Sequence, residues 1–424
     1  MKISKLHIDQ FRHLENLDFD FTYPDDFHLE EKRGKPLDKI CFIGQSATGK
    51  TSLLELINED INGFLKTELD DHGNVWYNSH NYNSNLKLVK DKTSFEYSNG
   101  AISKNDIVLP NSLKDNTLIF NLFAETDSIF HITSEILSDQ NIKLFEEDTV
   151  LLIERFKKNR HNLKNDDYSK LTFDYKVDEK IWITLLEENV SYIQNFLQFA
   201  TELINSGNVL NNSSQKVVDQ WKKHNINPLV SFSEKFNIIL EKIQLEIDIN
   251  NTKNIIPLKH KTTGENIPIK NISTGTKQLL LTAFPLIKLD TTNSIILIDE
   301  PERSLYPDMQ MDLMDYYQKL APEAQFIVAT HSPFVAASFE PDERFILYFD
   351  NEGKVAVRRG SSPIGDDPND MLKNDFGVNY YNKHGEEAYQ KYINLKQQVA
   401  NETDPKKKKE LILETVKLGD TYNF

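Results

Sequence analysis

The chain has 424 residues, of which 39% are hydrophobic and 10% aromatic, enough for two or three globular units with their own cores. Its 49 basic and 65 acidic residues give a net charge of −16, which argues against a surface coated for nucleic acid but leaves a local basic groove open. No apolar run approaches the roughly 20 residues that span a bilayer, and the start reads as a strand rather than a signal peptide. The single Cys41 excludes a disulfide framework. We therefore expect a cytoplasmic protein.

The first elements are two strands and a buried third strand. Apolar and polar residues alternate along "KLHIDQFRHLENLDFDF", which predicts two strands before a charged loop from Pro24 to Pro36. The run "KICFI", residues 39–43, reads as a buried strand, and "TSLLELIN" from Thr51 reads as a helix.

Between that strand and that helix lies a glycine-bounded loop with the pattern G-x-x-x-x-G-K-[ST]. Glycines let backbone N–H groups curl around phosphate oxygens, Lys50 reaches the β- and γ-phosphates, and the Thr51 hydroxyl completes a Mg²⁺ shell. The alternative is an ordinary polar turn, but the flanking strand and helix favour a site for ATP and Mg²⁺. The predicted binding residues are Gly44, Gln45, Ser46, Ala47, Thr48, Gly49, Lys50, Thr51 and Ser52.

The middle of the chain changes from strands to helices. Asn99-Gly100 predicts a hairpin, so an antiparallel sheet should lie beside the nucleotide core, and "NTLIFNLFAE" predicts a buried strand. From about residue 128 to 254 the pattern is helical and polar, without sustained heptads. We expect an inserted helical lobe rather than a coiled-coil arm.

The C-terminal third returns to strands. A hairpin is expected at Thr263-Gly264 and another at Asn351-Glu352-Gly353. Between them lie the predicted helix "TKQLLLTAF", the strand "SIILIDEPE", a helix over 307–320 and the strand "QFIVATHSP". The tail from Met371 should form two or three helices, one of them starting at Asp404-Pro405.

Acidic residues and a histidine follow the last two of these strands. Asp299 could hold Mg²⁺ through water, and Glu300 could polarise the water that attacks the γ-phosphate. His331 ends the next strand, where a neutral imidazole could sense the γ-phosphate. The alternatives are an acidic turn and a structural histidine. A shared sheet edge with the phosphate loop favours catalytic roles for Glu300 and His331.

A hydroxyl and a glycine stand in front of the helix that precedes these strands. Ser273 and Gly275 in "ISTGTKQ" bring a side-chain oxygen, a flexible backbone and a helix N-terminus to one spot suited to an anion. In isolation the same residues also read as an ordinary N-capped helix.

The order of these motifs resembles one family. The phosphate loop, an inserted lobe, "STGTKQ", "ILIDEPE" and "ATHSP" look like the ATP-binding-cassette heads of the SMC, RecF and overcoming-lysogenization-defect (OLD) group. "DEPE…LYP" is similar to a variant common among predicted phage-defence ATPases of the AAA family, with Septu- and PARIS-type subunits closest. The resemblance covers residues 1–125 and 255–360.

The resemblance implies roles and a dimer. Arg12 would approach the nucleotide, Asp299 would be the Mg²⁺ carboxylate, and Ser273 and Gly275 would cap ATP held by a second head. Two features depart from the family. The glutamine that acts as a sensor in the family is missing after "LIFNLF", so either Glu125 takes its role or no residue does, and threonines flank Gly275. We therefore expect slow hydrolysis.

The predicted fold is α/β, an ABC-type head with a P-loop core and an antiparallel β subdomain. We expect four regions: 1–127 and 255–360 for the head, 128–254 for the inserted lobe and 361–424 for a helical tail. The favoured function is an ATPase switch that dimerises around ATP and controls a separate nuclease or toxin in bacterial antiphage defence. The alternatives are a RecF/SMC-like DNA repair ATPase, and an OLD-type ATPase whose nuclease is on another chain. We expect no tight binding of nucleic acid.

Overall fold

The computed structural model describes two compact units, Met1–Gly365 and Asp366–Phe424. The described residues are 1–66, 83–90, 93–98, 101–102, 119–122, 179–206, 212–251, 257–267, 271–288, 291–378, 383–422 and 424. Among them, no helix is both long and apolar enough to cross a membrane.

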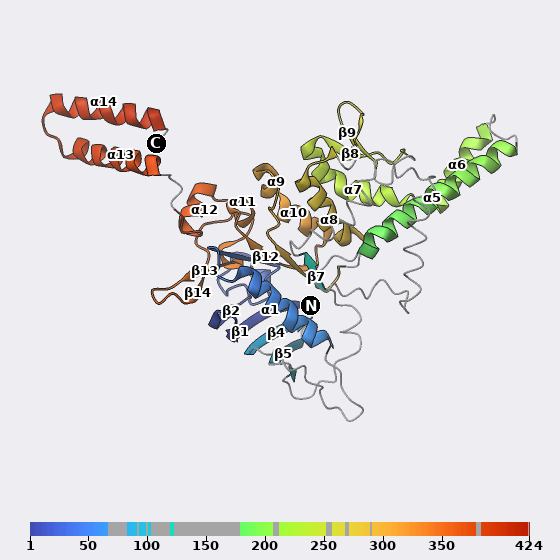
Figure 1. Cartoon of the computed structure of the whole chain (residues 1–424), viewed down its shortest axis with the longest axis horizontal. Coiled ribbons are helices and arrows are strands. Elements are labelled where there is room, and N and C mark those ends of the chain that lie inside the picture. Colours follow the sequence, from blue (N-terminus) through green and yellow to red (C-terminus); the bar gives the residue numbers. More distant parts are fainter. Residues whose placement is uncertain are drawn as a thin grey trace. The chain divides into compact units, whose positions relative to one another are not determined.

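A six-stranded sheet forms the centre of the first unit (Figure 1). Its order is β14-β13-β3-β12-β11-β7, and every neighbouring pair is parallel except β13 with β14. All residues of β3 and β12 are buried, as expected for parallel strands covered on both faces. The strands are β3 Lys39–Gly44, β7 Ile119–Leu122, β11 Ile295–Asp299, β12 Gln325–Thr330, β13 Arg344–Phe349 and β14 Val355–Arg359.

A five-stranded antiparallel sheet lies beside it, in the order β2-β1-β4-β5-β6. Ile3, Leu6 and Ile8 of β1 are buried while Lys5 and Asp9 are exposed, so one face packs on the core and the other meets water. The strands are β1 Lys2–Phe11, β2 Leu14–Asp20, β4 Asn83–Lys90, β5 Thr93–Ser98 and β6 Ala101–Ile102. The predicted pairing across Asn99-Gly100 is confirmed by β5 and β6, although the two turn residues lie outside the described set.

Helix α1, Lys50–Lys66, packs between the two sheets. Its buried leucines and isoleucines join one apolar cluster with residues of β1, β3, β11 and β12. Near its C-terminal end, the ring of Phe64 meets Phe95 at 5.8 Å and Tyr97 at 6.3 Å, both on β5. The helix therefore holds the antiparallel sheet against the parallel one.

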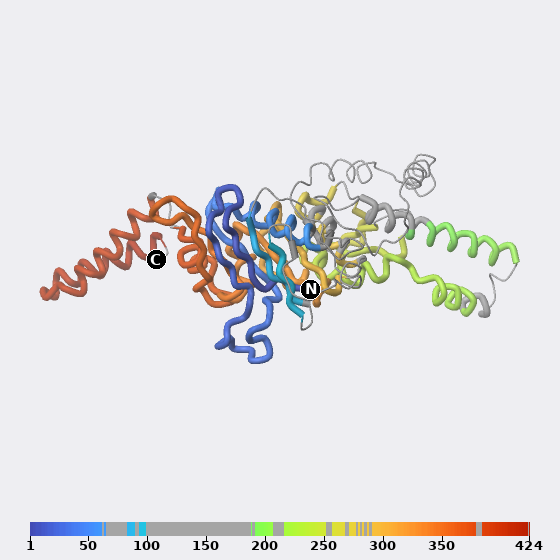
Figure 2. The backbone as a smooth tube through the Cα atoms, turned by 90° about the horizontal axis from the view of Figure 1, so that it is seen from below, coloured from blue at the N-terminus to red at the C-terminus, as the bar shows by residue number. Residues whose placement is uncertain are grey.

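The loop between β2 and β3 carries the predicted charged segment and projects from the strands (Figure 2). It contains the short 3-10 helix η1, Glu30–Lys32, and closes through a bridge between Thr22 and Pro36.

The segment predicted to form an inserted lobe contains helices α5 Glu179–Asn205, α6 Asn212–His224 and α7 Pro228–Leu240, then the 3-10 helix η4 Glu241–Ile243. Helices α5 and α6 run side by side in Figures 1 and 2. Trp221 of α6 joins them by ring contacts of 5.2–5.6 Å to Tyr192, Phe196 and Phe199, which share one face of α5. The first part of the predicted lobe, through residue 178, lies outside the described set.

A three-stranded sheet, ordered β10-β9-β8, follows these helices. Its strands are β8 Leu245–Ile247, β9 Leu258–His260 and β10 Asn266–Ile267, so strands return earlier than the sequence pattern indicates. The turn between β9 and β10 contains Gly264 with φ +69°, which confirms the hairpin predicted at Thr263-Gly264.

The remaining helices of the first unit are α8 Thr274–Lys288, α9 Pro307–Met311, α10 Leu313–Leu320, α11 Pro333–Ala336 and the 3-10 helix η6 Pro341–Glu343. The single helix predicted over 307–320 is wrong. It is interrupted at Asp312, whose backbone leaves the helical region with φ −102° and ψ 3°, and whose carboxylate pairs with Lys242 of η4. The hairpin predicted at Asn351-Glu352-Gly353 is confirmed between β13 and β14.

The second unit consists of α12 Pro368–Asn374, α13 Lys383–Asn401 and α14 Pro405–Tyr422. Asp404 starts α14 as predicted, because its carboxylate accepts a bond of 2.9 Å from the backbone N–H of Lys406. Helices α13 and α14 are joined by the pair Lys391–Glu414 at 3.0 Å. The predicted α/β head with an antiparallel subdomain and a helical tail is confirmed, while the four-region boundaries stay a prediction.

Candidate functional site

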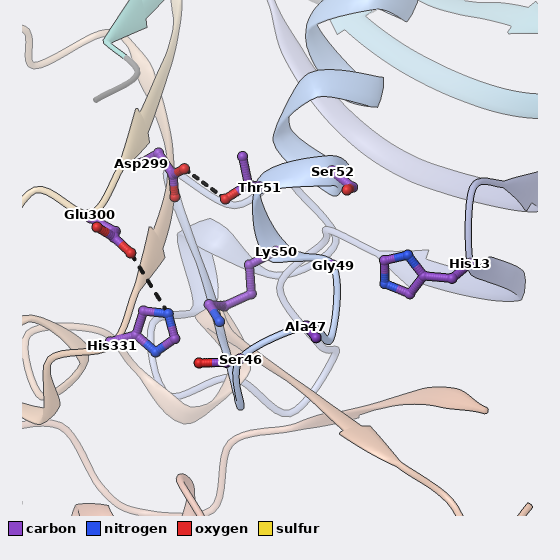
Figure 3. A pocket seen from close by; sticks show the side chains of 10 residues that line it. All are labelled: His13, Ser46, Ala47, Gly49, Lys50, Thr51, Ser52, Asp299, Glu300 and His331. Carbon is purple, nitrogen blue, oxygen red and sulfur yellow. Dashed lines mark hydrogen bonds and ion pairs between the residues drawn. The ribbon is translucent and has the colours of Figure 1, made fainter. Parts of the chain in front are cut away.

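Three neighbouring parallel strands end at one edge of the six-stranded sheet. Strand β12 lies between β3 and β11, so the phosphate loop, the residues after β11 and the residues after β12 meet there. These segments line one cavity, which also includes a residue from the turn between β1 and β2 (Figure 3). The lining residues are His13, Ser46, Ala47, Gly49, Lys50, Thr51, Ser52, Asp299, Glu300 and His331.

The loop has the backbone that an anion site needs. Ala47 and Gly49 have positive φ values of 67° and 92°, and the first N–H groups of α1 have no partner within the helix. A Cβ on Gly44 would come within 2.5 Å of the Leu347 carbonyl oxygen, so this position has room only for glycine. The sequence pattern therefore corresponds to a tightly packed loop around the start of α1.

Lys50 is held across this loop. Its Nζ donates to the carbonyl oxygens of Gly44 at 2.8 Å and Gln45 at 3.2 Å. Burial lowers the pKa of Lys50, and the charges of Asp299, Glu300 and Glu302 oppose that effect. The ammonium group is thus desolvated, and the negative charges of these three residues partly offset the cost.

Thr51 and Asp299 are in direct contact at the cavity wall. The Thr51 hydroxyl donates to Asp299 Oδ2 at 2.7 Å (Figure 3). Burial raises the pKa of Asp299, and the bond from Thr51 counteracts this. Two oxygen ligands from separate segments therefore lie side by side.

Glu300 and His331 face each other on the same side of the cavity. His331 Nε2 lies 3.8 Å from Glu300 Oε1, as Figure 3 shows. Burial lowers the pKa of His331, and the positive charge of Lys50 lowers it further, which favours the neutral imidazole. Glu300 has a left-handed backbone with φ 48°, a strained conformation that is often found at functional sites.

Other residues predicted for the site lie elsewhere. Gly44, Gln45 and Thr48 belong to the loop but do not line the cavity. Arg12 is also outside the lining: its guanidinium bonds the Ser52 hydroxyl at 3.0 Å and pairs with Glu55. Glu125 lies outside the described residues.

Ser273 and Gly275 lie at the start of α8, outside the lining of this cavity. The Ser273 hydroxyl accepts from the Thr276 N–H at 3.2 Å, as a helix cap does. A Cβ on Gly275 would come within 2.2 Å of the Ser304 carbonyl oxygen, so α8 packs closely against the turn after β11.

Two residues with contacts in this site were missed by sequence reasoning. His13 is one of the residues that line the cavity. A Cβ on Gly49 would lie only 2.8 Å from His13 Nε2, which shows that the β1–β2 turn packs against the phosphate loop. Glu302 Oε1 accepts from the backbone N–H of His331 at 2.7 Å. No spacing rule points to His13, whereas Glu302 is the second glutamate of "DEPE".

Comparison with protein families matches residues 59–336 to the model described as AAA ATPase domain. That range is more than half of the chain. The chain belongs to the AAA ATPase domain family. This ATPase domain match begins after the phosphate loop, so the roles of residues 44–52 rest on their own pattern and geometry.

Two curated relatives of this ATPase carry names from bacterial defence systems. Retron Ec83 probable ATPase of Escherichia coli is 27% identical over 165 residues, which covers 38% of this chain and 28% of the relative. Septu protein PtuA of Bacillus thuringiensis is 33% identical over 73 residues, 17% of this chain and 18% of the relative. The chain spans less than a third of each relative. The predicted resemblance to defence-associated AAA family ATPases is confirmed.

Among solved structures, the ATPase resembles two SMC heads at low similarity. The SMC head domain from Thermotoga maritima has a TM-score of 0.38 and 13% identity, over 85% of this chain and 100% of that one. A Pyrococcus furiosus Smc head domain has a TM-score of 0.37 and 15% identity, over 85% and 96% of the two chains.

Proposed function

We propose that this ATPase is a switch: two copies close around ATP and control a separate effector, a nuclease or a toxin, in bacterial antiphage defence. The observation that carries the proposal is the meeting of the phosphate loop with Asp299, Glu300 and His331 around one cavity. The two relatives named for a retron and for Septu support the defence context.

In this proposal each wall of the cavity has one task. Lys50 and the free N–H groups at the start of α1 bind the β- and γ-phosphates. Glu300 accepts a proton from the attacking water at its carboxylate, and neutral His331 hydrogen-bonds to that water or to the γ-phosphate.

The residues present fit a magnesium ion bound together with the phosphates. Thr51 Oγ1 and Asp299 Oδ2 are oxygen donors already 2.7 Å apart, next to the phosphate loop. Within the described residues, there is no group of three or more His, Cys, Asp or Glu side chains that could bind a metal ion without other ligands. Mg²⁺ usually takes only one or two protein ligands beside substrate phosphates, where it neutralises their charge.

The position of Ser273 and Gly275 supports the proposed dimer. Neither residue lines the cavity of its own chain, and the Ser273 side chain is exposed. If the start of α8 contacts ATP, that ATP must be held by a second copy. The N–H groups there and the Ser273 hydroxyl are donors suited to a γ-phosphate.

Mixing two inactive variants tests the shared site. Ser273→Arg should keep ATP binding and lose hydrolysis, because a bulky cation blocks closure, while Lys50→Ala should lose binding. A mixed dimer contains one site with both Lys50 and Ser273 intact, so ATPase activity should rise above the sum of the separate variants. No recovery in preparations shown to contain mixed dimers would contradict the arrangement.

The effector is sought among the products of neighbouring genes. A nuclease or toxin encoded alongside should bind this chain, and its activity should differ between Glu300→Gln, which holds ATP, and Lys50→Ala, which does not. Neighbouring replication genes together with nanomolar binding to duplex DNA at physiological salt would instead favour a repair ATPase.

A further inference from the structure

The turn after β11 is a closely held segment that connects the cavity to its surroundings. Its backbone closes on itself through bonds from Arg303 N–H to the Glu300 carbonyl at 3.0 Å and from Leu305 N–H to the Glu302 carbonyl at 2.9 Å. Glu300 and Ser304 both have left-handed φ values, 48° and 62°. Non-glycine residues keep such conformations only where the surrounding contacts fix them.

Glu302 supplies a contact from this turn to the neighbouring strand end. Its Oε1 accepts from the backbone N–H of His331 at 2.7 Å, whereas its other carboxylate oxygen, Oε2, is buried without a hydrogen-bond partner among the described residues. Burial raises the pKa of Glu302 and the charge of Glu300 raises it further, while the hydrogen bond from the His331 N–H lowers it. The Glu302 carboxylate is thus mostly shielded from water, and it holds the backbone of the residue just after β12.

The same backbone is fixed from its other side. Ser332 Oγ donates to Gln310 Oε1 at 2.6 Å and accepts from the N–H groups of Phe334 and Val335 at the start of α11. His331 therefore lies between Thr330, the last residue of β12, and the anchored Ser332. Its own N–H, held by Glu302, is the anchor that comes from the turn bearing Glu300.

We propose that Glu302 is a positioning residue for hydrolysis: by holding the backbone of His331 to the turn that carries Glu300, it keeps the imidazole and the Glu300 carboxylate facing each other. Glu302 does not line the cavity and touches neither phosphate nor water in this scheme. The separation it maintains is the 3.8 Å between His331 Nε2 and Glu300 Oε1. The inference rests on the roles proposed above for Glu300 and His331.

The first test separates positioning from binding. Glu302→Ala removes the acceptor, so kcat for ATP should fall by about 10- to 100-fold, the scale of a misplaced catalytic group, while the Kd for ATP changes little. Glu302→Gln keeps an oxygen that can accept the His331 N–H, so it should restore most of the rate. Glu323→Ala, an exposed glutamate before the start of β12, is the matched control and should behave like the wild type.

The second test asks whether Glu302 acts through His331. In a double-mutant cycle, Glu302→Ala should cost little further rate once His331→Ala is present, because residues that act as a unit are not additive. Fully additive losses, or a Glu302→Gln variant as slow as Glu302→Ala, would overturn the inference. If Glu302→Ala does not fold, Glu302→Met takes its place, since it keeps the length of the side chain but has no oxygen acceptor for the His331 N–H. Wild-type hydrolysis by Glu300→Gln would instead overturn the proposed catalytic roles themselves.

Discussion

The two large sheets of the first unit use charged residues in opposite ways. In the six-stranded sheet, β3 and β12 are buried throughout, and Lys50, Asp299, Glu300 and His331 gather where the strands end. In the antiparallel sheet, charges cover the outer face in pairs such as Lys5–Asp20 at 3.3 Å and Lys87–Glu96 at 3.7 Å.

The charged side chains of the two sheets therefore differ in what they can do: those at the strand ends are suited to chemistry, and those on the exposed face are suited to contact with water. Charges paired on an exposed face are screened by water and contribute little individually. Charges at the strand ends are partly desolvated, which shifts the pKa values of Lys50, Asp299 and His331 away from their usual ranges. The antiparallel sheet reaches the cavity through one lining residue, His13.

Lys50→Ala should have the largest effect. It removes the ammonium group expected at the β- and γ-phosphates, so ATP affinity should fall by about 100-fold or more. Isothermal titration with ATP measures this. Lys5→Ala, on the exposed face of β1, is the matched control and should bind ATP like the wild type. An unchanged ATP affinity in Lys50→Ala would contradict the assignment of the phosphate site to this edge of the sheet.

Gly275→Ala should destabilise the fold by about 1–3 kcal/mol, the usual cost of overpacking. The added Cβ would come within 2.2 Å of the Ser304 carbonyl, forcing α8 away from the turn after β11. Chemical denaturation gives the difference. Gly419→Ala in α14 is a control at a helical glycine whose Cβ would have its nearest neighbour at 3.3 Å, and should change stability much less. Equal stability of Gly275→Ala and the wild type would contradict this, because it would mean that α8 and the turn after β11 can move apart without cost.

His13→Ala should have a moderate effect on ATP and none on inorganic tripolyphosphate. Figure 3 shows His13 across Lys50 from Glu300 and His331, so it should face the nucleoside end of the ligand. Loss of one hydrogen bond predicts about 3- to 10-fold weaker ATP binding. Comparing Kd values for the two ligands checks this, and an equal loss for both would place His13 at the phosphates instead.

His7→Asn should have the smallest effect, and one that depends on pH. His7 bonds Asp18 at 2.7 Å and Asp9 at 3.1 Å, and the bond to Asp18 is the main cause of its raised pKa. The stabilisation by protonated His7 is fully present below the ordinary pKa of 6.5 and disappears as pH rises through the higher pKa of the folded state. Because the ring is solvent-exposed, we expect about 0.5 kcal/mol or less at low pH. Thermal melts of both proteins at pH 5.5 and pH 9 check the sign, and a larger loss at pH 9 would contradict it.

Sequence patterns predicted what depends on local chemistry. The spacing of Gly44, Gly49, Lys50 and Thr51 specifies a loop that needs positive φ and a free helix start, and the apolar runs around it specify buried parallel strands. The neighbouring ends of β11 and β12 then bring Asp299 and His331 to the edge.

Contacts between distant segments could not be predicted in the same way. His13 lines the cavity where α1 packs the antiparallel sheet against the parallel one. The sequence around His13 contains no pattern that predicts this packing. The bond from His331 to Glu302 requires the exact path of the turn after β11, with its left-handed residues. Helix α9 ends before Asp312, whose backbone leaves the helical region and whose carboxylate pairs with Lys242, far away in the sequence.

The central claim is that the ends of β3, β11 and β12 form a site that hydrolyses ATP, with Glu300 as the base. The most direct measurement compares Glu300→Gln with the wild type in ATP binding and in steady-state phosphate release. The amide keeps the shape of the carboxylate but cannot take the proton, so affinity should stay close to that of the wild type while the rate falls by about 100-fold or more. Phosphate release at the wild-type rate, with binding intact, would contradict the claim.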